Sequence, residues 1–238
     1  MSHIHLPDGV LPLWLWAGGY LVAALLLALA WRWGRRETDA KRFALLGIFA
    51  AMMLLVMSIE IPPYHANLSV VTGIILGPAL AVLAAWIVNV FLSFMGHGGV
   101  TVAGLNTLVI AIEMLSGYAV FHLLRRVRVP LAVAGFLAVI IGLGLGTGAS
   151  YGIIVAGAPT INASLRAPET THEHEPGPLT DAAQGGHLDL HRLAILMFGF
   201  GAIGWILEGI ISAAILVALN RVYPDLVIRA ETARIPES

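Results

Sequence analysis

The sequence predicts an all-α polytopic membrane protein, a bundle of seven transmembrane helices, with six as the alternative count. Of its 238 residues, 58% are hydrophobic and only 11% are charged, whereas a typical soluble domain has about 25% charged residues. Apolar runs long enough to cross a bilayer recur along the chain. The basic residues gather in clusters between these runs. We therefore expect one integral membrane domain over residues 1–238, in the inner or plasma membrane of the cell.

The expected spans are the apolar runs Leu11–Trp33, Phe43–Ile59, Asn67–Met95, Thr101–Leu124, Pro130–Ala156 and Leu193–Asn220. The third run is too long for one helix, and Gly77-Pro78 interrupts it. We expect it to form a short helix, a turn and a second helix, which makes seven crossings. A polar, histidine-rich loop is expected at about 159–190.

The basic residues determine the expected orientation. They cluster at residues 32–42, 125–128 and 221–234, and loops rich in Lys and Arg stay on the cytoplasmic side. Seven crossings put all three clusters inside, with the N-terminus outside and the C-terminus cytoplasmic. Six crossings would leave one cluster on the wrong side.

Composition also limits the chemistry. The formal net charge is −1, which argues against an electrostatic nucleic-acid binder, so membrane lipid and not nucleic acid is the expected contact. The chain has no cysteine and nine histidines, so a metal site must use imidazole, carboxylate, amide or backbone ligands. With the predicted topology, eight histidines lie in or beside external segments: His3, His5, His65, His97, His172, His174, His187 and His191.

The N-terminus is a candidate metal chelate. An amine, the following amide nitrogens and an imidazole can surround a divalent ion in a square plane, which suits Ni(II) and Cu(II). His3 supplies this arrangement as the third residue. If Met1 is removed, Ser2 carries the amine and His3 becomes the second residue. The alternative is a frayed tail with two incidental histidines, His3 and His5.

Other polar residues lie where they could support such a site. His65 follows Pro62-Pro63-Tyr64, whose prolines fix the backbone before it, although an ordinary interfacial histidine is the simpler interpretation of His65 alone. Asn106 and Glu113 share one helix face, and buried polar groups can orient a metal-bound imidazole. Asn89 fits helix–helix hydrogen bonding at least as well. Helix–helix hydrogen bonding is a weaker explanation for Glu208, because an ionisable group inside a membrane is costly.

Two further patterns are weaker. His172, His174, His187 and His191 form a histidine-rich loop in which loose metal gathering is possible, although a solvated linker is the simpler interpretation. A second pattern is G-x-S-x-G, which Gly148-Ala149-Ser150-Tyr151-Gly152 matches. This pattern makes an intramembrane serine protease an alternative function. That enzyme needs a histidine base beside the serine, and the last span has none inside the membrane.

Several motif blocks lie along the chain. They are residues 5–11 (His-Leu-Pro-Asp-Gly-Val-Leu), 65–68 (His-Ala-Asn-Leu), 73–78, 96–101 (Gly-His-Gly-Gly-Val-Thr), 104–106, Gly204 and 208–209. Together these blocks resemble the CbiM/NikM family, the substrate-capture components of energy-coupling-factor (ECF) transporters for cobalt and nickel. The resemblance covers nearly the whole chain except the polar loop.

The resemblance implies a seven-helix bundle with an external N-terminus inserted into its centre. Metal would be held by the N-terminal amine, the amide and imidazole of the second residue, and a histidine matching His65. It also implies three kinds of partner subunit: a transmembrane coupling subunit, two cytoplasmic P-loop ATPases and a small accessory membrane subunit. The chain itself has no P-loop motif, so ATP hydrolysis is expected on another chain.

Two positions depart from the family pattern. His5 aligns with the family histidine but lies three residues further from the chain start, so His3 and His5 both stay candidates for the N-terminal chelate. Phe91 stands where the family would have glutamine. We expect Ser2, His3, His5 and His65 as ligands, with Asp8, Glu60, His97, Asn106 and Glu113 as accessory groups.

The sequence thus predicts a non-enzymatic capture subunit for Ni(II) or Co(II) as transported substrate, with no organic cofactor. Nitrogen ligands would discriminate against Mg²⁺ and Ca²⁺, which prefer oxygen. The alternatives are a capture subunit for an organic micronutrient, which Trp14, Trp16 and Trp86 keep open, and the serine protease.

Overall fold

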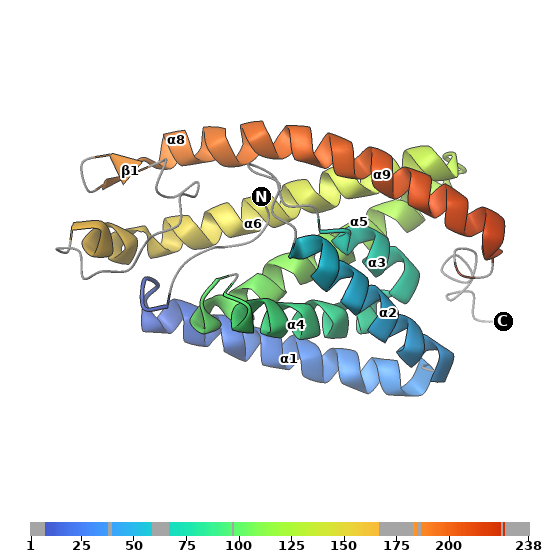
Figure 1. The fold of residues 1–238 in the computed structure, drawn as a ribbon, viewed down its shortest axis with the longest axis horizontal. Helices are drawn as coiled ribbons and strands as arrows, with labels where there is room; N and C mark the ends of the chain where they lie inside the picture. The colour runs from blue at the N-terminus through green and yellow to red at the C-terminus, as the bar shows by residue number, and fades with distance from the viewer. Residues whose placement is uncertain are drawn as a thin grey trace.

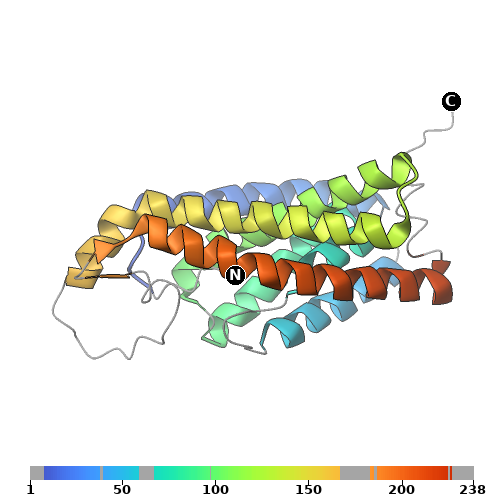
Figure 2. The same ribbon diagram turned by 90° about the horizontal axis from the view of Figure 1, so that it is seen from above.

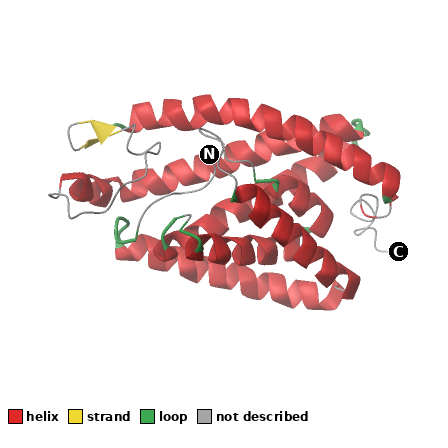
Figure 3. Cartoon of the chain, in the orientation of Figure 1, coloured by secondary structure: helices red, strands yellow, loops and turns green. Residues whose placement is uncertain are grey.

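The computed structural model describes residues 8–37, 40–58, 67–96, 98–166, 183–184, 187–224 and 226. The described elements are α1 (Leu13–Glu37), α2 (Ala40–Met57), α3 (Ser69–Leu76), α4 (Pro78–Phe94), η1 (Val100–Val102), α5 (Ala103–Arg126), α6 (Leu131–Arg166), β1 (Ala183–Gln184), β2 (His187–Leu188), α8 (Leu190–Ala194), η2 (Ile195–Phe200) and α9 (Gly201–Val222). Helices dominate, and the two short strands form a hairpin beside the start of α8 (Figure 3).

Five of the described helical segments are long and apolar enough to cross a membrane, and α4 is a shorter apolar helix. The protein is therefore a multi-pass membrane protein, as its composition predicts. Its exposed apolar side chains fit this environment, because a lipid-facing helix surface has no need of polar residues. In α9, for example, Ile206, Ile210 and Ile211 are about half exposed, at 49%, 56% and 53%.

The predicted break at Gly77-Pro78 is confirmed. Gly77 has φ of +76°, a conformation that glycine adopts without strain, and Pro78 starts α4. The first helix of the pair differs from a spanning helix, because α3 has only eight residues. At 1.5 Å per residue it is about 12 Å long, against a hydrocarbon core of about 30 Å. The count of seven crossings stays a prediction.

The ends of α1, α5 and α9 that carry basic residues lie at the same end of the bundle (Figures 1 and 2). Arg125 and Arg126 are in the last turn of α5, and Arg221 is in the last turn of α9. In the predicted orientation, all basic clusters must lie at one end of the bundle, as their described residues do here. Which end faces the cytoplasm stays a prediction.

The predicted polar loop begins later than expected. Helix α6 continues through Pro159 to Arg166, because apolar packing extends beyond the predicted end of the span. Ile161 is 3% exposed and packs in one cluster with Leu11 and Leu193. The last helical run starts at Leu190, three residues earlier than predicted, because the Asp189 side chain accepts hydrogen bonds from two amides of the first turn.

Helix α5 is the centre of the bundle, in contact with α1, α3, α4 and α6. Close backbone packing is needed between α3 and its neighbours. A Cβ at Gly73 of α3 would lie 2.8 Å from the Met114 carbonyl oxygen, and one at Gly142 of α6 would lie 2.9 Å from the Glu113 carbonyl oxygen. Glycine at these positions lets α5 and its neighbours enclose the short helix.

Candidate functional site

The structure describes five of the predicted site residues. They are Asp8, Asn106, Glu113, His187 and His191. The predicted ligands Ser2, His3, His5 and His65 lie outside the described residues. The predicted accessory residues Glu60 and His97 and the loop histidines His172 and His174 do so too. The described residues nevertheless include the segments that directly follow the N-terminal ligands and His65.

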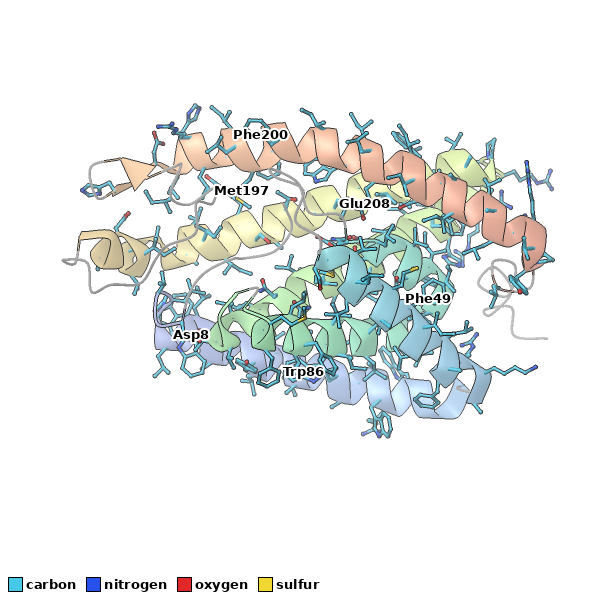
Figure 4. All side chains as sticks on the ribbon, in the orientation of Figure 1. Asp8, Phe49, Trp86, Met197, Phe200 and Glu208 are labelled. Atoms are coloured by element: carbon cyan, nitrogen blue, oxygen red, sulfur yellow. The ribbon has the colours of Figure 1, made fainter. Side chains whose placement is uncertain are left out.

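Asp8 anchors the segment that follows the N-terminal histidines. Its Oδ1 accepts a hydrogen bond from the Thr101 backbone N–H at 2.8 Å and another from the Thr101 hydroxyl at 2.7 Å. Gly99 permits this approach, because a Cβ there would lie 2.8 Å from both Cγ and N of Asp8. The Tyr20 hydroxyl donates to the Val100 carbonyl at 2.5 Å. Asp8 thus joins the N-terminal segment to the turn between α4 and α5 (Figure 4).

The hydrogen bonds favour the ionised form of Asp8. Partial burial acts to raise the pKa of this carboxyl, but donors from the backbone and hydroxyl of Thr101 and the backbone of Val100 outweigh it. The pKa of Asp8 therefore lies below its ordinary value of 3.8, and the anchor is ionised at neutral pH.

Glu208 of α9 holds the backbone just after His65. Its Oε1 accepts from the Leu68 N–H at 3.0 Å, and its Oε2 accepts from the Asn67 N–H at 3.3 Å. The side chain is 2% exposed and lies within the bundle (Figure 4). The two carboxylate oxygens therefore bind two consecutive backbone amides that precede α3.

Glu113 of α5 holds the same segment through side chains. Its Oε2 accepts from Asn67 Nδ2 and from Ser69 Oγ, both at 2.8 Å. Asn67 in turn accepts the Ser69 N–H at 2.9 Å, and Glu113 is fully buried. We call Glu113, Glu208 and residues Asn67–Ser69 the carboxylate clamp. It connects α5 and α9 to the start of α3.

The clamp holds a strained turn. Leu68 has φ of 51° and ψ of 20°, in the left-handed region, although it is not glycine. This conformation costs roughly 1–2 kcal/mol for a residue with a Cβ. Backbone strain of this kind persists where surrounding contacts enforce it, and it concentrates at functional sites. Both carboxylates of the clamp bind residues beside or at this turn.

The other predicted polar residues have simpler surroundings. Asn106 is 3% exposed, on the same helix as Glu113, which confirms the shared buried face. Asn89 donates to the carbonyl of Ala85 in its own helix at 2.7 Å, and the helix–helix hydrogen bond considered for it stays a prediction. His187 and His191 are exposed. Within the described ranges, no three His, Asp or Glu side chains gather as a metal site.

The structure describes the residues behind both alternative functions, the serine protease and the organic-micronutrient subunit. Ser150 is fully buried within α6, whereas a G-x-S-x-G nucleophile sits on an exposed strand-to-helix turn. Tyr20 makes edge-to-face contacts with Trp16 and Trp86, with ring centroids 6.4 and 6.1 Å apart. These aromatic rings pack on one another, while Trp14 is 65% exposed.

Comparison with known proteins identifies the family. Residues 5–226 match the family model described as "CbiM: Cobalt uptake substrate-specific transmembrane region". The chain belongs to the CbiM family. It is therefore a metal-uptake transmembrane component of the CbiM type, and the resemblance seen in its sequence blocks is confirmed.

Three relatives show how far CbiM similarity extends. A Haloquadratum walsbyi protein, provisionally named a metal transport protein, is 28% identical over 94% of this chain and 93% of its own length. The cobalt transport protein CbiM of Sorangium cellulosum is 32% identical over 57% of this chain and 64% of its own length. That of Geobacter sulfurreducens is 26% identical over 94% of this chain and 61% of its own length.

The fold is also that of a solved structure. A crystal structure of a transition metal transporter superimposes with a TM-score of 0.66, at 19% identity, and covers 98% of this chain and all of the other. A truncated transition metal transporter gives the same TM-score at 18% identity over 92% of this chain and 99% of the other. These two likenesses show that the chain shares its fold with both structures.

Sequence reasoning missed Ser69 and the backbone amides of Asn67 and Leu68 as partners of the buried carboxylates. Asn67 and Leu68 belong to the His-Ala-Asn-Leu block, but hydrogen bonds over 140 positions, such as that from Leu68 to Glu208, leave no periodic pattern. The only sequence signal was the presence of two glutamates in apolar helices.

Proposed function

We propose that this CbiM-family protein captures Ni(II) or Co(II) at the outer face of the membrane for an ATP-driven importer of the ECF type. The single observation that supports it most is the Asp8–Thr101 anchor. This anchor brings the chain just after Ser2, His3 and His5 onto the turn that contains His97. Ligands from a chain terminus need such an attachment, because a free terminus would lose much conformational entropy on binding.

In this proposal the ion is held by nitrogen atoms from the N-terminal segment and from His65. An amine, an amide nitrogen and imidazoles favour late divalent transition metals over Mg²⁺ and Ca²⁺. The energy for transport comes from two cytoplasmic P-loop ATPases, joined through a transmembrane coupling subunit. A small accessory membrane subunit completes the assembly.

Nitrogen ligation predicts a specific pH dependence. Protons compete with the metal for the amine, the amide and the imidazoles, so affinity should fall steeply between neutral and mildly acidic pH. Calorimetric titration of Ni(II) and Co(II) into detergent-purified protein with its native N-terminus measures this directly. An affinity that does not change over this range would exclude the proposed ligand set.

A matched pair of histidine variants distinguishes the loss of a metal ligand from the general effect of replacing a histidine. His65→Ala should lose metal binding. His122→Ala is the control, because His122 lies in α5 with Nδ1 2.8 Å from the Tyr118 carbonyl of its own helix and is not a proposed ligand. Equal binding by the two variants would contradict the assignment of His65.

A further inference from the structure

We propose that Glu208 and Glu113 are positioning residues for metal capture: their carboxylates fix the conformation of the Asn67–Ser69 turn, which follows the proposed ligand His65 in the chain. This inference rests on the proposed function, because it assigns a role beside the histidine taken there as a ligand. Neither glutamate is proposed to touch the metal. Each acts through the backbone or side chains that follow His65.

The geometry of Glu208 requires a carboxylate. Two neighbouring N–H groups, those of Asn67 and Leu68, each donate to a different oxygen of Glu208. An ionised carboxylate offers only acceptors, whereas glutamine offers one acceptor oxygen and an NH₂ donor. In Glu208→Gln, that NH₂ would face a backbone N–H and leave one buried amide without an acceptor, although the side-chain size hardly changes.

The geometry of Glu113 is more tolerant. Both of its hydrogen bonds within the clamp, from Asn67 Nδ2 and Ser69 Oγ, end on the same oxygen, Oε2. A glutamine whose carbonyl oxygen occupies that position can accept both. The two glutamates, both nearly inaccessible to solvent, should therefore respond differently to the same chemical change.

The turn itself explains why such a clamp is needed. Leu68 is in the left-handed region at φ of 51°, so the unrestrained chain would favour another conformation. His65 lies three residues before Leu68, so a change in this turn alters the backbone next to the proposed ligand. Groups that orient a metal-bound histidine typically change metal affinity by about 10- to 100-fold when they are removed.

The test uses the full-length protein with its native N-terminus and Ni(II) or Co(II) alone as the probe. We expect Glu208→Gln to weaken binding by about 10-fold or more and to alter the visible absorption spectrum of the bound metal, since the ligand geometry changes. Glu113→Gln should have a smaller effect on both. Ser69→Ala removes one hydrogen bond of the clamp and should weaken binding by about three-fold, because only part of the energy of that bond is passed on to metal affinity.

Two control variants remove buried hydroxyls from the same helices without touching the clamp. Thr107→Val in α5 replaces a hydroxyl that bonds the Ala103 carbonyl of its own helix. Ser212→Ala in α9 removes a buried Oγ that has no hydrogen-bond partner among the described residues, one turn after Glu208. Both should bind metal with the wild-type affinity and spectrum.

The outcomes separate the two proposals. Wild-type protein that binds neither metal would refute the proposed function. Wild-type protein that binds metal, together with Glu208→Gln and Ser69→Ala variants of unchanged affinity and spectrum, would refute the positioning role alone. If Glu208→Gln does not fold, as judged by size-exclusion chromatography, Ser69→Ala decides: an unchanged spectrum and affinity would overturn the inference.

Discussion

A methyl group at position 146 should disrupt the carboxylate clamp from the opposite side. Gly146 lies in α6 against the Glu113 side chain. A Cβ built there would lie 2.7 Å from Cδ of Glu113 and nearer still to its Cγ and Oε1. In Gly146→Ala the carboxylate must therefore move, and its bonds to Asn67 and Ser69 must lengthen or break.

The expected cost follows from these contacts. Overpacking of this kind costs about 1–3 kcal/mol, and one lost hydrogen bond to a charged group adds about 1.5–3 kcal/mol. Alanine recovers about 1 kcal/mol through its higher helix propensity. The net destabilisation of Gly146→Ala should be about 1.5–5 kcal/mol, which for a chain of this size lowers the Tm by at least about 3 °C.

The matched control is Gly148→Ala, two residues further along α6. A Cβ at Gly148 meets no atom within 4 Å, so this variant should be as stable as the wild type or slightly more stable. Thermal unfolding of both variants in detergent, followed by tryptophan fluorescence, measures the difference. A Tm for Gly146→Ala equal to or above that of Gly148→Ala would refute the placement of Glu113 against α6.

Three further predictions concern the end of the bundle where Asp8 lies. Asp8→Ala should weaken Ni(II) or Co(II) binding by about 10-fold, measured calorimetrically, while Asp8→Asn should lose less because its amide oxygen can still accept from Thr101; equal losses would contradict this. The pKa of Asp8 lies below 3.8 in the folded protein, so its stabilising effect is complete above that value and is lost as pH falls through the lowered pKa. The Tm difference between wild type and Asp8→Asn should accordingly disappear on acidification; a constant difference would argue against an ionised anchor. Asn162→Ala removes the acceptor of the Leu188 N–H, 2.7 Å away, and should speed hydrogen exchange of that amide without affecting metal binding.

The apolar helices could largely be predicted from the sequence, because length and hydropathy determine what can cross a bilayer. The break at Gly77-Pro78 could be predicted as well, since both residues have strong local effects on the backbone. The length of α3 and the end of α6 could not. Both depend on tertiary packing, as at Ile161, which lies in a cluster with residues from distant helices.

The site was predictable only in part. Glu113 was expected to support the ligands, because ionisable groups within a membrane are costly and tend to be functional. Asp8 was expected to do so because it lies in the N-terminal block that resembles the CbiM/NikM family. Their partners were not predictable. Asp8 bonds Thr101, and Glu113 bonds Ser69; such long-range pairs depend on how helices pack and leave no pattern in a single sequence.

The central claim is that this chain itself holds a transition metal through its N-terminal segment and His65. The most direct test is elemental mass spectrometry of the detergent-purified protein with its native N-terminus, after loading with Ni(II) and Co(II) and removal of free ion. Our account predicts near-stoichiometric metal in the wild-type protein and its loss in His65→Ala. A wild-type protein that carries neither metal would contradict the claim and favour an organic micronutrient as the substrate.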